Sequence, residues 1–96
     1  MNNLGKIKKQ LEEIKPEIIK KYHVESIGLF GSVVRNDFLP ESDIDIIVAF
    51  TKPVGIEFID LADFIEKKLA QKIDLVSKNG IKEKYFKSIE DDIVYV

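Results

Sequence analysis

The segment Asp43–Phe50, which reads DIDIIVAF, limits the folds open to this 96-residue chain more than any other stretch. Apart from its two acids, every residue in it is apolar: Ile44, Ile46, Ile47, Val48, Ala49 and Phe50. Successive side chains of a strand point to opposite faces, so both faces of this strand are apolar. Such a strand is typical of the middle of a sheet that is covered on both sides. We therefore expect Asp43–Phe50 to be a central strand.

The rest of the chain alternates between helical and extended patterns. Helices are predicted at Leu4–Tyr22, Val33–Asp37, Phe58–Leu69 and Ile81–Ile89. Further strands are predicted at Val24–Phe30, Lys72–Ser77 and Ile93–Val96. This alternation favours an α/β (α+β) fold with one central sheet flanked by helices. Because proline lacks the N–H group that a helix interior needs, we expect a kink or a restart at Pro16.

Length and composition predict a single domain, residues 1–96, and exclude several classes of protein. The 15 basic and 17 acidic residues form no long block of one sign, so there is no strong signal for nucleic-acid binding. The absence of cysteine excludes disulfides and thiolate chemistry. No signal peptide or membrane-spanning run is present, and we expect a cytoplasmic protein. A core this small would gain stability from oligomerisation or a bound partner.

Asp43 and Asp45 are unusual residues with which to begin a buried strand. Their spacing places both carboxylates on one face, about 7 Å apart. Like charges at that distance oppose each other's ionisation unless a cation lies between them. Mg²⁺ suits the pair, because it accepts one or two protein carboxylates and completes its shell with water and phosphate oxygens. The alternative is a pair of solvated acids at the mouth of a strand.

Asp74 interrupts the next apolar strand. A helix that links two strands of one sheet usually makes a right-handed crossover, which would place Lys72–Ser77 parallel to Asp43–Phe50. Asp74 would then join the other two acids at one end of the sheet. Three carboxylates on adjacent strands favour a site for two metal ions that acts on a triphosphate. Taken alone, Asp74 would more often be an exposed or edge residue.

Gly31-Ser32 follows the first predicted strand and forms a turn before a short helix. The glycine lets the backbone approach a ligand, and N–H groups at the helix start together with the hydroxyl of Ser32 can bind phosphate. Arg35 is the one arginine beside fourteen lysines. Its planar guanidinium can hold a phosphate through two hydrogen bonds. The alternatives are a simple turn, and a salt bridge from Arg35 to Asp37 or Glu41.

Together these residues resemble the minimal nucleotidyltransferase family, whose members are small relatives of DNA polymerase β. The family pattern is Gly-Ser, ten residues and Asp-x-Asp, and Gly31-Ser32 is followed at that spacing by Asp43-Ile44-Asp45. The strand that carries Asp74 and the closing Val94-Tyr95 fit as well. The resemblance therefore covers nearly the whole chain.

The resemblance implies a polymerase β-like nucleotidyltransferase fold that transfers AMP from ATP to an acceptor hydroxyl. It implies that Asp43, Asp45 and Asp74 hold two Mg²⁺ ions and are catalytic. It further implies that Gly31 and Ser32 hold the triphosphate, with Arg35 where the family often has a basic residue. Members of the family are often paired with a HEPN protein as antitoxin and toxin. The resemblance therefore implies an antitoxin that adds AMP to a tyrosine of a HEPN toxin.

Two functions without transfer stay open: a non-catalytic antitoxin that blocks its partner by contact, and a nucleotide sensor. The presence of all three aspartates favours catalysis. Among the other polar residues, His23 is interpreted as a helix cap. Tyr85 and Phe86 are expected in the core or at a partner surface.

Overall fold

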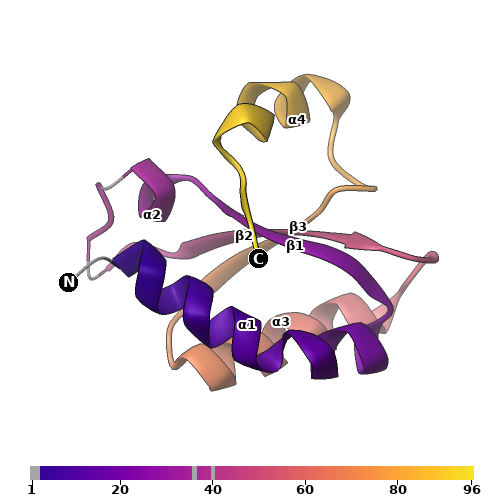
Figure 1. Cartoon of the computed structure of the whole chain (residues 1–96). Coiled ribbons are helices and arrows are strands. Elements are labelled where there is room, and N and C mark those ends of the chain that lie inside the picture. The colour runs from indigo at the N-terminus through magenta and orange to yellow at the C-terminus, as the bar shows by residue number, and fades with distance from the viewer. Residues whose placement is uncertain (1–2, 36, 40) are drawn as a thin grey trace.

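The computed structural model of the chain describes residues 3–35, 37–39 and 41–96 (Figure 1). Its helices are α1 (Asn3–Tyr22), α2 (Ser32–Arg35), α3 (Ile56–Leu69) and α4 (Glu83–Ile89), and a 3₁₀ helix, η1 (Glu90–Asp92), follows α4. Its strands are β1 (Val24–Phe30), β2 (Ile44–Phe50), β3 (Ile73–Ser77) and β4 (Val94–Tyr95). Each predicted element is present, and no bound differs from the prediction by more than two residues. Residue 36, inside the second predicted helix, lies outside the described residues.

The four strands form one mixed sheet in the order β3-β2-β1-β4. β2 lies antiparallel to β1 and parallel to β3, while β4 pairs antiparallel with β1. β2 is therefore central, as its two apolar faces predict. Helix α3 connects the parallel strands β2 and β3 as a crossover. The predicted mixed central sheet flanked by helices is confirmed.

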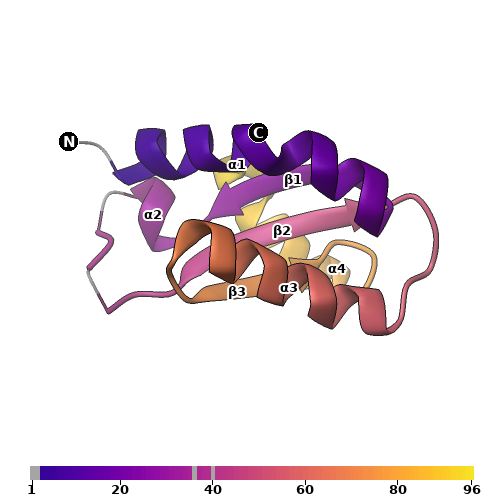
Figure 2. The same ribbon diagram turned by 90° about the horizontal axis from the view of Figure 1, so that it is seen from below.

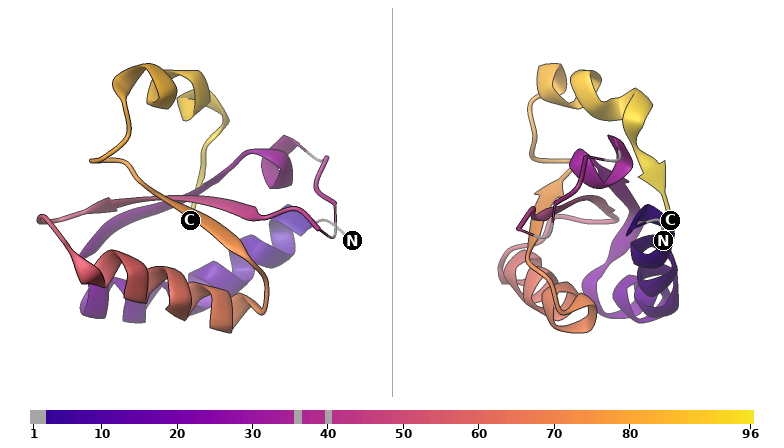
Figure 3. Two further views of the ribbon diagram at one scale, coloured as in Figure 1. Left: turned by 180° about the vertical axis from the view of Figure 1, so that it is seen from behind. Right: turned by 90° about the vertical axis from the view of Figure 1, so that its left-hand side faces the viewer.

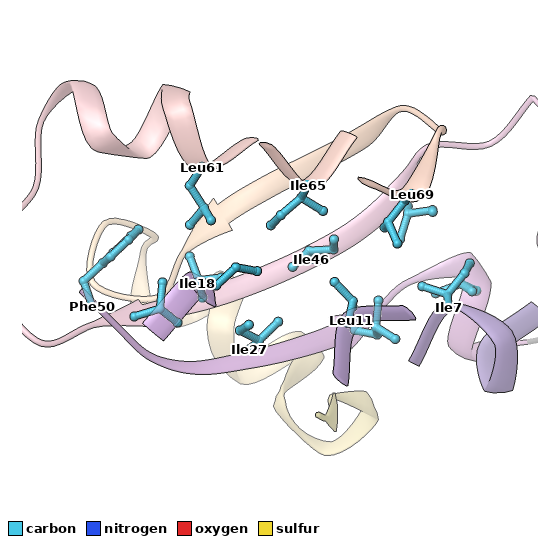
Figure 4. Packing of buried hydrophobic residues seen from close by; sticks show 14 residues of the cluster. Ile7, Leu11, Ile18, Ile27, Ile46, Phe50, Leu61, Ile65 and Leu69 are labelled. Atoms are coloured by element: carbon cyan, nitrogen blue, oxygen red, sulfur yellow. The ribbon is translucent and has the colours of Figure 1, made fainter. Parts of the chain in front are cut away.

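Helices α1 and α3 lie side by side against one face of the sheet, and α4 stands over the opposite face (Figures 1, 2 and 3). The core fills the space between the sheet and the two long helices (Figure 4). It includes Ile7, Leu11 and Ile18 of α1, Ile27, Ile46 and Phe50 of the sheet, and Leu61, Ile65 and Leu69 of α3. Burying each such side chain contributes about 1.5–3 kcal/mol. In contrast, α4 has no buried side chain, so the core does little to hold it.

Helix α1 runs without a break through Pro16, so the predicted restart is not observed. Pro16 is exposed, whereas Leu11 and Ile18 on either side of it are fully buried. Their packing against the sheet keeps both halves of the helix in place despite the lost hydrogen bond. The helix ends before His23, whose φ of 58° is left-handed and whose carbonyl accepts a hydrogen bond from the N–H group of Thr51 at 2.8 Å. Among the described residues, no helix is long and apolar enough to cross a membrane.

Candidate active site

The turn between β1 and α2 depends on Gly31. Its φ of 76° is a left-handed conformation, which favours glycine. Its carbonyl accepts hydrogen bonds from the N–H groups of Val34 and Arg35, each at 3.0 Å, and these bonds close the first turn of α2. A Cβ atom at this position would overlap the carboxylate of Asp45. The backbone at Gly31 can therefore lie against that carboxylate because it carries no side chain.

Asp45 lies near the start of β2, between the two neighbouring strands. It is opposite Phe30 of β1 and opposite Asp74 of β3. The predicted parallel pairing that brings Asp74 to the level of Asp45 is thus confirmed. Asp43 lies just before the strand, since β2 begins at Ile44, and the predicted start of the strand at Asp43 is wrong by one residue. Asp43, which precedes the strand, is exposed, and so is Asp74 in β3, whereas Asp45 is half-buried.

The pKa of the Asp45 carboxyl lies above its usual value. Partial burial is the largest cause, because it penalises the charged form. Repulsion from the carboxylates of Asp74 and Asp43 raises the pKa further, and the positive charge of Arg35 opposes these effects. The carboxylates of Asp43 and Asp74 therefore both lie close enough to affect Asp45, and Arg35 acts electrostatically on the same position.

Arg35, at the end of α2, forms an exposed ion pair, with 3.6 Å between its Nε atom and the Oδ2 atom of Asp37. This is one of the two salt bridges expected as an alternative to phosphate binding. The side chains of Arg35 and Asp37 are 58% and 61% exposed, so the pair contributes little to stability. A phosphate could replace Asp37 as the partner of the guanidinium at small cost.

An open pocket of about 200 Å³ brings several of these residues together over the sheet. It is lined by Phe30, Gly31, Arg35, Asp45, Tyr85, Ser88, Ile89 and Asp92. Three of the predicted site residues, Gly31, Arg35 and Asp45, thus share one cavity. Asp43 lines a different pocket, with Ser42 and Lys72 among its neighbours. Ser32 and Asp74 line neither pocket.

Residues of α4 and η1 line this pocket although no sequence pattern points to them. The sequence places Tyr85 in the core or at a partner surface, but 46% of it is exposed and it faces the pocket, so the core assignment is wrong. Asp92 carries no signal of its own, because it lies in the acidic run Glu90–Asp92, which is typical of a solvated surface. A chain path that returns over the sheet after β3 brings both residues to Asp45.

The acidic residues of the site can provide the one or two carboxylate ligands that a magnesium ion needs from a protein. Among the described residues, no three His, Cys, Asp or Glu side chains form a group that could hold a metal ion. Mg²⁺ needs only one or two protein carboxylates, since water and substrate phosphates complete its octahedron. Asp43 and Asp45 can supply these carboxylates. The repulsion from Asp43 and Asp74 contributes to the raised pKa of Asp45, and a bound cation would offset this repulsion.

The glycine turn after β1 is packed against the Asp45 carboxylate near the start of β2, so the Gly-Ser and Asp-x-Asp segments that carry the sequence resemblance meet in the structure. Residues 5–96 match the nucleotidyltransferase domain family, and the chain belongs to this family.

Two relatives align with this chain over its full length. The chain is 36% identical over 97 residues to the protein adenylyltransferase MntA of Thermococcus cleftensis, covering 100% of this chain and 98% of that protein. It is 43% identical over 100 residues to a Methanocaldococcus jannaschii protein provisionally named as a protein adenylyltransferase, covering 100% of both. The predicted enzyme class, nucleotidyltransferase, is therefore confirmed.

The fold is also found in solved structures. It matches a structure provisionally described as a minimal nucleotidyltransferase with a TM-score of 0.81 and 22% identity, covering 98% of this chain and 95% of that one. It matches a structure of the tri-AMPylated Shewanella oneidensis HEPN toxin in complex with its MNT antitoxin with a TM-score of 0.62 and 24% identity, covering 99% of this chain and 71% of that one. At these identities the two matches establish the fold, which is the predicted nucleotidyltransferase fold.

Proposed function

We propose that this nucleotidyltransferase moves AMP from ATP to a hydroxyl group of a protein, with Mg²⁺ as its cofactor. The observation that carries the proposal is the contact between the Gly31 turn and the Asp45 carboxylate, in a pocket that also contains Arg35. The proposal needs a backbone that can approach phosphate beside an acid that can hold a cation, and this contact is consistent with both. Two full-length relatives named as protein adenylyltransferases support the same reaction.

Each site residue has a defined task in this proposal. Asp43 and Asp45 hold Mg²⁺, which when bound offsets the negative charge of the triphosphate. Gly31 and Ser32 hold the phosphates from the turn, and the guanidinium of Arg35 exchanges Asp37 for a phosphate oxygen. Asp74, opposite Asp45 and exposed, orients the acceptor hydroxyl and accepts its proton as the oxygen forms a bond to the α-phosphorus of ATP. The bond from that phosphorus to the β-phosphate oxygen breaks, and pyrophosphate leaves.

The acceptor we propose is a tyrosine of a HEPN toxin, so that the chain acts as an antitoxin. One structural relative is an MNT antitoxin in complex with a HEPN toxin that is tri-AMPylated. The site itself is compatible with a folded protein as acceptor, since the pocket at Asp45 is open, and Asp43 and Asp74, which act electrostatically on Asp45, are exposed. A side chain presented on the surface of a partner can therefore reach these carboxylates.

The test is transfer of label from ATP labelled at the α-phosphate, with Mg²⁺ and with the product of the neighbouring gene, which the proposal expects to be a HEPN protein. We expect label on the HEPN protein with the unchanged chain and at least a hundredfold less with Asp74→Asn, given the size of general acid–base contributions. Asp63→Asn is the matched control, because Asp63 is an exposed acid on α3, on the other side of the sheet.

Three outcomes separate the candidate functions. Label that disappears with Asp74→Asn but stays with Asp63→Asn supports transfer to the partner. No label on any protein, although the two proteins co-elute on a sizing column and the toxin is inhibited, would support an antitoxin that acts by contact alone. Nucleotide binding without label or co-elution would support a sensor.

A further inference from the structure

The pocket beside Asp45 is lined from two sides by different elements of the fold. Phe30, which is 4% exposed, and the polar positions Gly31, Arg35 and Asp45 form one wall where β1 ends and β2 begins, and the proposed function places phosphates and cation there. Tyr85, Ser88, Ile89 and Asp92 form the facing wall, on α4 and η1. With a volume of about 200 Å³ the pocket is smaller than the roughly 300–1,000 Å³ typical of sites that enclose a whole organic ligand. It can therefore enclose only part of a nucleotide.

Tyr85 contributes little to the fold. It is 46% exposed, and in the described part of the chain its ring is paired with no other aromatic ring, unlike Tyr22, which packs on Phe64 at 5.7 Å. The helix that carries it has no buried side chain. Its local contact is a hydrogen bond from the hydroxyl of Ser88 to its backbone carbonyl, which does not involve the ring. The ring is thus an available apolar surface inside a polar pocket.

The distribution of charge determines which part of a nucleotide suits this wall. The carboxylate of Asp92 lies on the same wall as Tyr85 and would repel phosphates there. On the opposite wall Arg35 attracts phosphates, and the proposed cation offsets the charge of Asp45. An uncharged group that is flat and apolar on its faces fits beside Tyr85 and Ile89. A nucleobase has these properties, and bases stack on exposed aromatic side chains.

We propose that the ring of Tyr85 stacks on the base of the bound nucleotide and makes α4 the wall that selects it. This inference rests on the proposed function, since it assumes that phosphates bind at Gly31 and Arg35. A purine offers a larger stacked surface than a pyrimidine, so the wall favours purine nucleoside triphosphates. Tyr85 acts here through its ring and not through its hydroxyl.

The experiment measures equilibrium binding by titration calorimetry on the full chain with Mg²⁺. The probes are an ATP analogue that cannot transfer AMP, the corresponding CTP analogue, and inorganic triphosphate, which has no base. With Tyr85→Ala we expect the affinity for the ATP analogue to fall about tenfold, as loss of one stacked base predicts. Binding of triphosphate should be unchanged, and the preference for the ATP analogue over the CTP analogue should be lost.

Two further variants serve as controls. Tyr85→Phe keeps the ring and should bind the ATP analogue within about twofold of the unchanged chain. Tyr95→Ala removes a tyrosine of matching exposure, 47%, which lies in β4 and does not line this pocket. It should leave all three affinities unchanged, and thermal melts of each variant verify that it is folded.

The results distinguish this inference from the proposed function. Unchanged affinity of Tyr85→Ala for the ATP analogue, in a chain that binds it and labels its partner, would overturn the role of Tyr85 and leave the proposed function intact. An equal loss of affinity for triphosphate and for the ATP analogue would also overturn it, because the wall would then hold phosphate. Failure of the unchanged chain to bind any of the probes would overturn both.

Discussion

At the scale of single residues, Gly31 has two separate reasons to be glycine, and each can be tested. Its left-handed φ costs another residue about 1–2 kcal/mol, and any Cβ would displace the Asp45 carboxylate. We expect Gly31→Ala to lose at least about 1 kcal/mol of stability in urea unfolding and to abolish transfer. Gly80→Ala is the control, since its added Cβ would meet nothing closer than 3.8 Å. Equal losses in the two variants would show that neither reason applies at Gly31.

The partial burial of Asp45 and the neighbouring carboxylates oppose its charged form in the folded chain, so its contribution to stability depends on pH. Its pKa is raised in the folded state, so its contribution to stability is most favourable below the unfolded pKa, near 3.8, and becomes less favourable as pH rises through the folded pKa. We therefore expect Asp45→Asn to unfold at higher urea concentration than the unchanged chain at pH 7 in EDTA, with a smaller difference at pH 3.5.

Mg²⁺ should reverse the order of the two proteins at pH 7, because only the unchanged chain keeps the full carboxylate pair that binds it. A difference in stability between Asp45→Asn and the unchanged chain that is the same at both pH values would argue against charge repulsion at this position. Loss of the fold in Asp45→Asn would make the acid structural.

At the scale of elements, α2 ends at Arg35, whose guanidinium forms only an exposed, weak ion pair with Asp37. Arg35→Lys keeps the charge but loses the two-bond fork, so we expect the affinity for triphosphate to fall about fivefold, or about 1 kcal/mol, by titration calorimetry. Stability should change by less than about 0.5 kcal/mol, because the ion pair with Asp37 is exposed. Asp37→Asn, which frees the guanidinium, should bind triphosphate at least as tightly as the unchanged chain.

Helix α1 contains a proline in its interior, and packing against the core keeps the helix continuous there. Pro16 removes one hydrogen bond from the middle of the helix, at an exposed position where its side chain buries little. We expect Pro16→Ala to raise the free energy of unfolding by about 1–3 kcal/mol in urea. Leu11→Ala, at a fully buried position on the same helix, should instead lower it by about 2–5 kcal/mol. An unchanged free energy of unfolding in Pro16→Ala would mean that the backbone of the helix accommodates the proline ring at no cost in stability.

At the scale of the whole molecule, the sequence predicts the sheet and one side of the pocket. The two apolar faces of β2 and the crossover rule predict the central strand and the parallel position of Asp74, because both depend on local pattern and on chain connectivity. Tyr85 and Asp92 could not be predicted, since they reach Asp45 through the path of α4 over the sheet. No periodic pattern encodes that path, because α4 buries no side chain.

The pairing of β4 with β1 also has a consequence for the timing of folding during synthesis. Gly28 and Leu29 of β1 pair with Tyr95 and Val94, and the N–H group of Val96 donates to the carbonyl of Ile27 at 2.9 Å. A ribosome delivers β1, β2, α3 and β3 before these residues, so a nascent chain can assemble the acids well before it can anchor the far end of α4 and η1. A chain that has not yet released β4 therefore lacks the strand pairing that ties the segment after η1 to the sheet.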